Sequence, residues 1–134
     1  MSEASEVQSE VQPYDVIVSV VAEYVDSESD PNQKRYVFTY TVTIINQGSM
    51  PARLLTRHWL ITDSNGMTQE VRGDGVVGEQ PYLSPGEGFR YTSGTVLDTP
   101  IGAMQGSYLM RADDETEFDA VIKPFSLADP KVLH

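Results

Sequence analysis

Apolar and polar residues alternate with a period of two along most of this chain. The alternation is clearest from Lys34 to Asn46, where a face containing Tyr36, Phe38 and Tyr40 opposes a threonine-rich face. A period of two predicts a β-strand with one face in the core. The same pattern predicts strands over residues 16–25, 34–46, 53–63, 67–72, 89–96, 103–112 and 116–123.

Glycine, proline and asparagine residues separate the predicted strands. The pair Asn65-Gly66 lies between two extended runs and is typical of a type I′ hairpin turn, so residues 67–72 should fold back on the preceding strand. On that preceding strand, Leu55, Trp59 and Ile61 should share one face. No segment has the period of an amphipathic helix. The pattern therefore predicts an all-β fold, an antiparallel β-sandwich of seven to eight strands.

The composition fits one domain and excludes several kinds of site. The chain has 134 residues and no cysteine, which excludes disulfides, thiolate nucleophiles and cysteine-ligated zinc. Its formal net charge of -11 disfavours nucleic acids and anionic membranes as partners. Residues 1–12 are acidic and poor in apolar side chains, so we expect a disordered tail before a domain at 13–134. Without a signal-peptide pattern or a bilayer-length apolar run, a cytoplasmic location is expected.

A glycine-rich segment supplies the most specific motif. Gly73, Gly75 and Gly78 have the spacing G-x-G-x-x-G, which binds dinucleotides when it closes a strand and opens a helix. Pro81 and Pro85 follow within ten residues, so no helix can form there. We therefore expect a loop between strands, whose amides either cradle an anion or only turn the backbone.

Charged residues flank this glycine-rich loop. In the anion-binding interpretation, Arg72 or Arg57 is the charge partner of a phosphate. Asp74 and Glu79 would repel a polyphosphate unless Mg²⁺ lay between them. The candidate ligand-binding residues are thus Gly73, Asp74, Gly75, Gly78, Arg72 and Arg57.

Catalytic and metal sites have little support in the sequence. His58 is the single internal histidine, and neither a serine nucleophile motif nor a second internal histidine accompanies it, so we expect a structural strand histidine that is either hydrogen-bonded within the protein or solvated. The acidic residues from Asp113 to Asp119 could hold Mg²⁺ through oxygen ligands but more often form a solvated hairpin tip. We predict no catalytic residue, no metal site and no cofactor.

Several segments together resemble the ApaG family in order and spacing. They lie at residues 40–46, 57–61, 71–81, 83–87, 91–94, 104–108 and 124–128. The resemblance covers roughly residues 12–134 and implies a fibronectin type III-like, immunoglobulin-like sandwich in a bacterial cytoplasmic protein. It also implies a link to cobalt resistance and magnesium efflux, a kinship with interaction modules of eukaryotic F-box and polymerase-interacting proteins, and pyrophosphate as a candidate ligand of the glycine motif.

Three functions follow as expectations. The first is a non-enzymatic ApaG-type module that binds a protein partner, or a nucleotide or pyrophosphate, through residues 73–78 and Arg72. The second is a Mg²⁺-dependent phosphohydrolase of nucleotides or dinucleoside polyphosphates that uses His58 or Asp74. The third is a divalent-cation sensor. The apolar end of the chain, from Pro124 to His134, should cover the sandwich or pair with a second copy in a homodimer.

Overall fold

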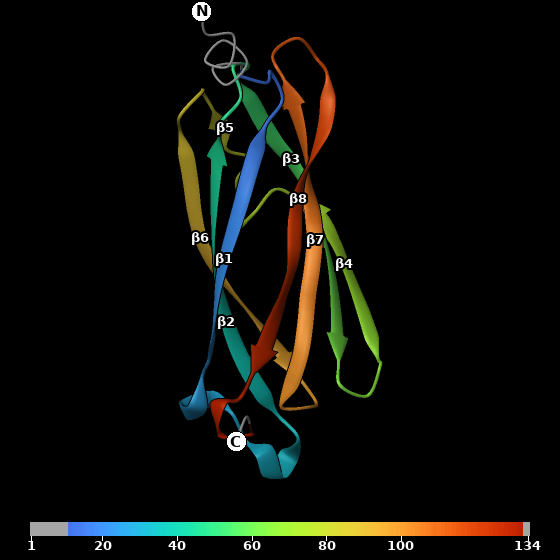
Figure 1. The fold of residues 1–134 in the computed structure, drawn as a ribbon. Helices are drawn as coiled ribbons and strands as arrows, with labels where there is room; N and C mark the ends of the chain where they lie inside the picture. Colours follow the sequence, from blue (N-terminus) through green and yellow to red (C-terminus); the bar gives the residue numbers. More distant parts are fainter. Residues whose placement is uncertain (1–10, 133–134) are drawn as a thin grey trace, which may run out of the picture.

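The computed structural model describes residues 11–132 and folds into two antiparallel sheets packed face to face (Figure 1). The strands are β1 (Val16–Tyr24), β2 (Tyr36–Asn46), β3 (Ala52–Asp63), β4 (Thr68–Asp74), β5 (Tyr82–Leu83), β6 (Gly88–Leu97), β7 (Ile101–Ala112) and β8 (Glu117–Ala128). Three short 3₁₀ turns lie at Asp26–Glu28, Pro31–Gln33 and Pro130–Val132. The predicted all-β sandwich of seven to eight strands is confirmed. Most of the predicted acidic tail, and the last two residues, lie outside the described residues.

The two sheets have the orders β1-β2-β6 and β4-β3-β7-β8, with β5 paired to β3 beyond the glycine-rich loop. Along one side of the sandwich β1 packs against β8, so that side is closed. Along the other side, β4 and β6 are the edge strands of their sheets. Within residues 11–132, no helix has the length and apolar character needed to cross a bilayer.

The hairpin at Asn65-Gly66 is confirmed, but its turn differs from the predicted one. A type I′ turn needs positive φ at both central residues, whereas here only Gly66 has positive φ, at 82°. The amide of Gly66 donates to the carbonyl of Asp63, and one carboxylate oxygen of Asp63 accepts from the amides of Asn65 and Met67. The aspartate side chain therefore stabilises a longer turn in which a single residue is left-handed.

A bulge in β3 corrects the predicted faces of that strand. Leu54 pairs with Met110 and Thr56 with Leu109, so Leu55 is an extra residue without a partner on β7. The extra residue reverses the alternation, and Leu54 is fully buried while Leu55 is only half-buried. Trp59 and Ile61 do face the core, but Leu55 does not share their face as predicted.

Strand β8 is longer than the sequence pattern indicates, because it continues past Pro124 to Ala128. Lys123 and Pro124 together oppose Gln105, which is a bulge on an edge strand, where a proline removes no essential hydrogen bond. Beyond the bulge, Leu127 is fully buried and the ring of Phe125 packs 6.0 Å from that of Trp59. This part of the chain end therefore covers the sandwich, one of the two predicted arrangements.

Aromatic side chains join the two sheets at the centre of the core. Trp59 on β3 is 2% exposed, and its ring lies 5.2 Å from that of Tyr40 on β2. The hydroxyls of Tyr91 on β6 and Tyr108 on β7 hydrogen bond to each other within the core. Burial raises the pKa of Tyr91 to about 12 and raises the pKa of Tyr108 further.

These raised pKa values predict a loss of stability in alkali. Below about pH 10 both phenols are neutral in the folded and unfolded states, so their contribution is complete. As the pH rises from there towards about 12, only the unfolded chain ionises, so the free energy of unfolding should fall by roughly 1 kcal/mol or more. Urea unfolding near neutral pH and at about pH 11 measures this fall.

The double variant Tyr91→Phe, Tyr108→Phe is the matched control, because it removes both phenols without leaving one hydroxyl unpaired. Its stability should depend less on alkaline pH than that of the unsubstituted protein. An equally steep fall in the double variant would show that other groups cause the dependence.

Candidate functional site

The glycine-rich loop begins as a tight hairpin. The amide of Val76 donates to the carbonyl of Glu79 and the amide of Glu79 to that of Val76, so Val77 and Gly78 are the two central residues. Their φ angles of 43° and 82° are those of a type I′ turn, the turn predicted at Asn65-Gly66. Val76 is fully buried, whereas Val77 is 56% exposed. The hairpin is thus anchored in the core and presents a strained valine at its tip.

The amides of Gly75, Val76 and Glu79 in this loop already have partners. Gly75 donates to the carbonyl of Leu55 at 2.9 Å, and Val76 and Glu79 bond to each other. The carbonyl freed by the bulge in β3 therefore fixes the start of the loop. An anion would have to displace these bonds before three neighbouring amides could converge on it.

Each glycine of the motif has a conformational or steric reason to be glycine. A Cβ at Gly73 would lie 2.7 Å from Nη2 of Arg57, so the guanidinium fits against this residue only because no side chain is present. Gly75 has φ of 62°, and a Cβ there would collide with the carbonyl oxygen of Glu79. Gly78 occupies the left-handed second position of the turn.

Arg57 is the charged residue that the loop encloses. Its Nη1 donates to the carbonyl oxygens of Asp74 at 2.9 Å and Gly75 at 3.0 Å. Among residues 11–132, no carboxylate lies within ion-pair distance of Arg57, and its Nε and Nη2 groups make no hydrogen bond. A half-buried guanidinium therefore keeps donors for a ligand in a strongly acidic protein.

The structure divides the six predicted site residues between two faces. Arg57 and Gly73 are paired across β3 and β4 on the inner side, and Gly75 and Gly78 follow in the loop. Arg72 lies on the outer face, where its Nη2 donates to Glu70 at 2.9 Å, and the exposed Asp74 shares that phase of the strand. Arg72 and Arg57 therefore do not converge on one ligand.

His58 belongs to the outer face as well. Its Nε2 lies 2.6 Å from a carboxylate oxygen of Glu70. The hydrogen bond from His58, together with the positive charge of the nearby Arg72, lowers the pKa of Glu70 below its usual value. The contact gives the predicted structural role of this histidine a partner that the sequence did not reveal.

The acidic hairpin after β7 is bonded internally. The carboxylate of Asp113 accepts from the hydroxyl of Tyr82, and that of Asp114 from the hydroxyl of Tyr14. In the described part of the chain, no three histidine, cysteine or acidic side chains are grouped as metal ligands.

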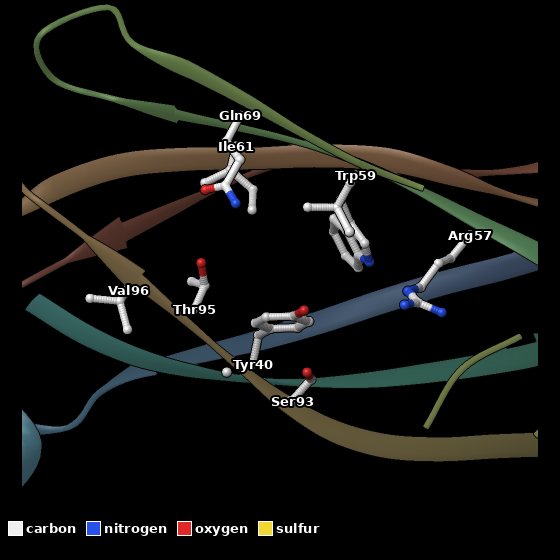
Figure 2. Close-up of a pocket in the computed structure, with 10 residues that line it drawn as sticks. Tyr40, Arg57, Trp59, Ile61, Gln69, Ser93, Thr95 and Val96 are labelled. Atoms are coloured by element: carbon white, nitrogen blue, oxygen red, sulfur yellow. The ribbon is translucent and has the colours of Figure 1, made fainter. Parts of the chain in front are cut away.

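A groove runs along the open side of the sandwich, between β4 and β6, and we call it the edge groove. Its central part has a volume of about 440 Å³ and narrows towards the glycine-rich loop into a part of about 220 Å³. The two parts share Tyr40, Arg57, Trp59 and Ser93. Figure 2 shows the rings of Tyr40 and Trp59 next to each other and the guanidinium of Arg57 directed into the space beside them.

Sequence reasoning found Arg57 but missed the other residues of the edge groove. Tyr40 and Trp59 were predicted only as core residues. Alternation places them on the inner faces of their strands, where a side chain can both pack in the core and line the groove. A usable signal lay in Gln69, Ser93 and Thr95, which are polar residues at inward-facing positions of their strands. Polar side chains at such positions indicate that the two sheets do not close there.

Comparison with known proteins gives one family. The ApaG domain model matches residues 26–112. Protein ApaG from Aromatoleum aromaticum is 56% identical over 126 residues, covering 94% of this chain and 99% of its own. Protein ApaG from Ectopseudomonas mendocina is 56% identical over 121 residues, covering 90% and 96%. A crystal structure of a Bordetella pertussis protein described as ApaA has a TM-score of 0.89 and 53% identity, covering 92% of this chain and 100% of that one.

The strained tip of the loop predicts a stabilising substitution. Val77→Asn should raise the free energy of unfolding by about 1 kcal/mol, because asparagine tolerates positive φ far better than a β-branched residue. Urea unfolding measures the change. Val77→Ile keeps the branched Cβ and should leave stability near that of the unsubstituted protein. Equal stabilities for the asparagine and isoleucine variants would show that the turn stores no such strain.

Proposed function

Because this chain belongs to the ApaG domain family, we propose that it acts as a non-enzymatic binding module that holds part of a protein partner in the edge groove. The observation that carries the proposal is the half-buried guanidinium of Arg57, which faces this groove without an acidic partner among residues 11–132. Burying a cation costs free energy unless hydrogen bonds compensate it. Two carbonyls supply part of that compensation, and a ligand would supply the rest.

The lining of the edge groove also suits a protein segment. Val71 and Val96 line the groove beside the hydroxyls of Ser93 and Thr95 and the amide of Gln69, next to the almost fully buried rings of Tyr40 and Trp59. Such a mixture offers apolar contact area together with hydrogen-bonding groups that fix orientation. The glycine-rich loop then serves the site indirectly, since its carbonyls orient Arg57.

Site-specific photo-crosslinking tests the location of the partner. A photoreactive residue in place of Val96, at the rim of the edge groove, should form an adduct with a defined protein in cells. The same residue in place of Val21, which is 67% exposed on the outer face of β1, is the matched control and should not form that adduct. An adduct at Val21 without one at Val96 would place the partner elsewhere and contradict the proposal.

A small phosphorylated ligand is the second candidate. The guanidinium of Arg57 favours it, because its N–H donors match the spacing of phosphate oxygens and only Nη1 is engaged by carbonyls. Pyrophosphate titrated into labelled protein should shift the Arg57 side-chain Nε–H and the Trp59 indole N–H in NMR spectra. The amides of Gly75, Val76 and Glu79 should shift less, because they already donate to carbonyls. Saturable shifts confined to those amides would instead support the glycine loop as the phosphate site. No shift, with or without Mg²⁺, would remove the phosphorylated ligand.

A further inference from the structure

Gly94 on β6 is a glycine that the fold itself does not require. All ten glycines lie in the described part of the chain. Nine of them either have positive φ or would place a Cβ less than 3.0 Å from another atom. At Gly94 φ is not positive, and a Cβ would meet only the Phe38 carbonyl oxygen, at 3.4 Å. A strand glycine without such a reason is typical of a place where another backbone approaches closely.

The hydrogen-bonding register directs the backbone of Gly94 away from β2. At one end of the β2 and β6 pair, the amide of Asn46 donates to the carbonyl of Glu87. Hydrogen-bonded pairs recur at every second residue of an antiparallel ladder, so Ser93 and Thr95 direct their amides and carbonyls at β2. Thr92, Gly94 and Val96 therefore direct theirs at the free edge.

That free edge borders the edge groove. Gly94 and Val96 line its central part, and β6 pairs with no strand other than β2 among the described residues. Many free edges are protected by proline or lysine, and β6 contains neither. The edge thus presents unpaired amides and carbonyls beside the edge groove, which is the arrangement that accepts an added strand.

Charge differs between the two ends of the edge groove. Arg57 lies at the end near the glycine-rich loop. Beyond the central part, a continuation of about 270 Å³ is lined by Asp63 and Asp98 and shares Ile61, Gln69 and Val96 with it. Asp98 lies five positions after Ser93 and directly follows β6, which corresponds to roughly 17 Å in an extended strand.

We propose that the edge groove binds an extended peptide segment of a partner protein, which pairs antiparallel to β6 at Gly94 and places a carboxylate on Arg57 and a cationic side chain near Asp63 and Asp98. Because the segment runs antiparallel to β6, its cationic residue precedes its acidic one, and a spacing of about four or six positions directs both side chains into the groove. This inference rests on the proposed function and adds the conformation, direction and charge order of the ligand. A second copy of this chain is a poorer occupant, since each copy carries a net charge of -11.

The test uses random linear peptides displayed in a library and selected on the full-length protein. Selected peptides are then synthesised, and their affinities are measured for the unsubstituted protein and for two variants at one position. Gly94→Ala keeps the amide that faces the free edge, and its methyl group meets only an ordinary contact within the fold, but it intrudes on the close approach of the added strand, so it should bind a few-fold more weakly. Gly94→Pro removes that amide and places a ring at the edge, so it should bind at least tenfold more weakly.

The peptides themselves test the charge order. Selected sequences should place lysine or arginine about four or six residues before an acidic residue, as the length of the edge groove and the alternation of side chains in a strand require. Replacing that acidic residue by its amide should weaken binding about tenfold, as expected for loss of a charge-assisted hydrogen bond. Asp98→Asn should weaken binding of the same peptides without affecting stability, since Asp98 is exposed.

A measurement on the unsubstituted protein covers the case in which Gly94→Pro fails to fold. Bound peptide should slow hydrogen exchange at the amides of Thr92, Gly94 and Val96, and unchanged exchange there would overturn the inference. The inference would also be overturned if both Gly94 variants bound with equal affinity, if the selected peptides had the reverse charge order, or if no peptide were recovered. A dimer of this chain that only Gly94→Pro dissociates would overturn it as well, because the occupant would then be a second copy. If any of these results accompanies a specific adduct at Val96, the edge groove still binds a partner, but not by strand addition.

Discussion

The hydrogen bonds from Arg57 to the carbonyls of Asp74 and Gly75 are the contact on which the candidate site depends. They join β3 to the loop that leaves β4, and the bulge at Leu55 fastens the same loop through the amide of Gly75. Val76, buried beyond that point, gives the loop a third attachment in the core. One guanidinium is thereby held at the mouth of the edge groove while part of its donor set stays available. Its orientation is set by backbone atoms, so it does not depend on a neighbouring acidic side chain.

The glycine-rich motif acquires a different meaning in this setting. The G-x-G-x-x-G spacing favours phosphate binding when the amides converge on an empty space. Here Gly73 leaves room for a guanidinium, Gly75 for a carbonyl, and Gly78 completes a turn. Three separate local requirements thus produce a spacing that looks like one motif. What distinguishes such a loop from a phosphate cradle is where its amide protons are directed.

The sequence predicted the architecture well, because alternation with a period of two is a property of each strand by itself. The sequence did not predict the local features that depend on tertiary contacts. The extra residue at Leu55 is specified by the carbonyl that Gly75 needs, and the continuation of β8 through Pro124 depends on its place at an edge. The type I′ turn formed at Val77-Gly78, with a residue that tolerates positive φ poorly, because buried Val76 and the paired Glu79 over-determine it. The site was only partly predictable, since identical alternation places Tyr40 and Trp59 in the core and along the groove.

The two sides of the sandwich differ in whether further strands can be added to their sheet edges. On the closed side, β1 packs against β8, and β8 carries the bulge at Lys123 and Pro124. Head-to-tail polymerisation through a sheet requires an accepting edge and an unbroken donating edge on the same molecule. The free edges of β4 and β6 both lie on the open side, where they flank the edge groove. Sheet extension is therefore confined to one side of the molecule, which restricts the geometry in which copies of the chain could pair through their edges.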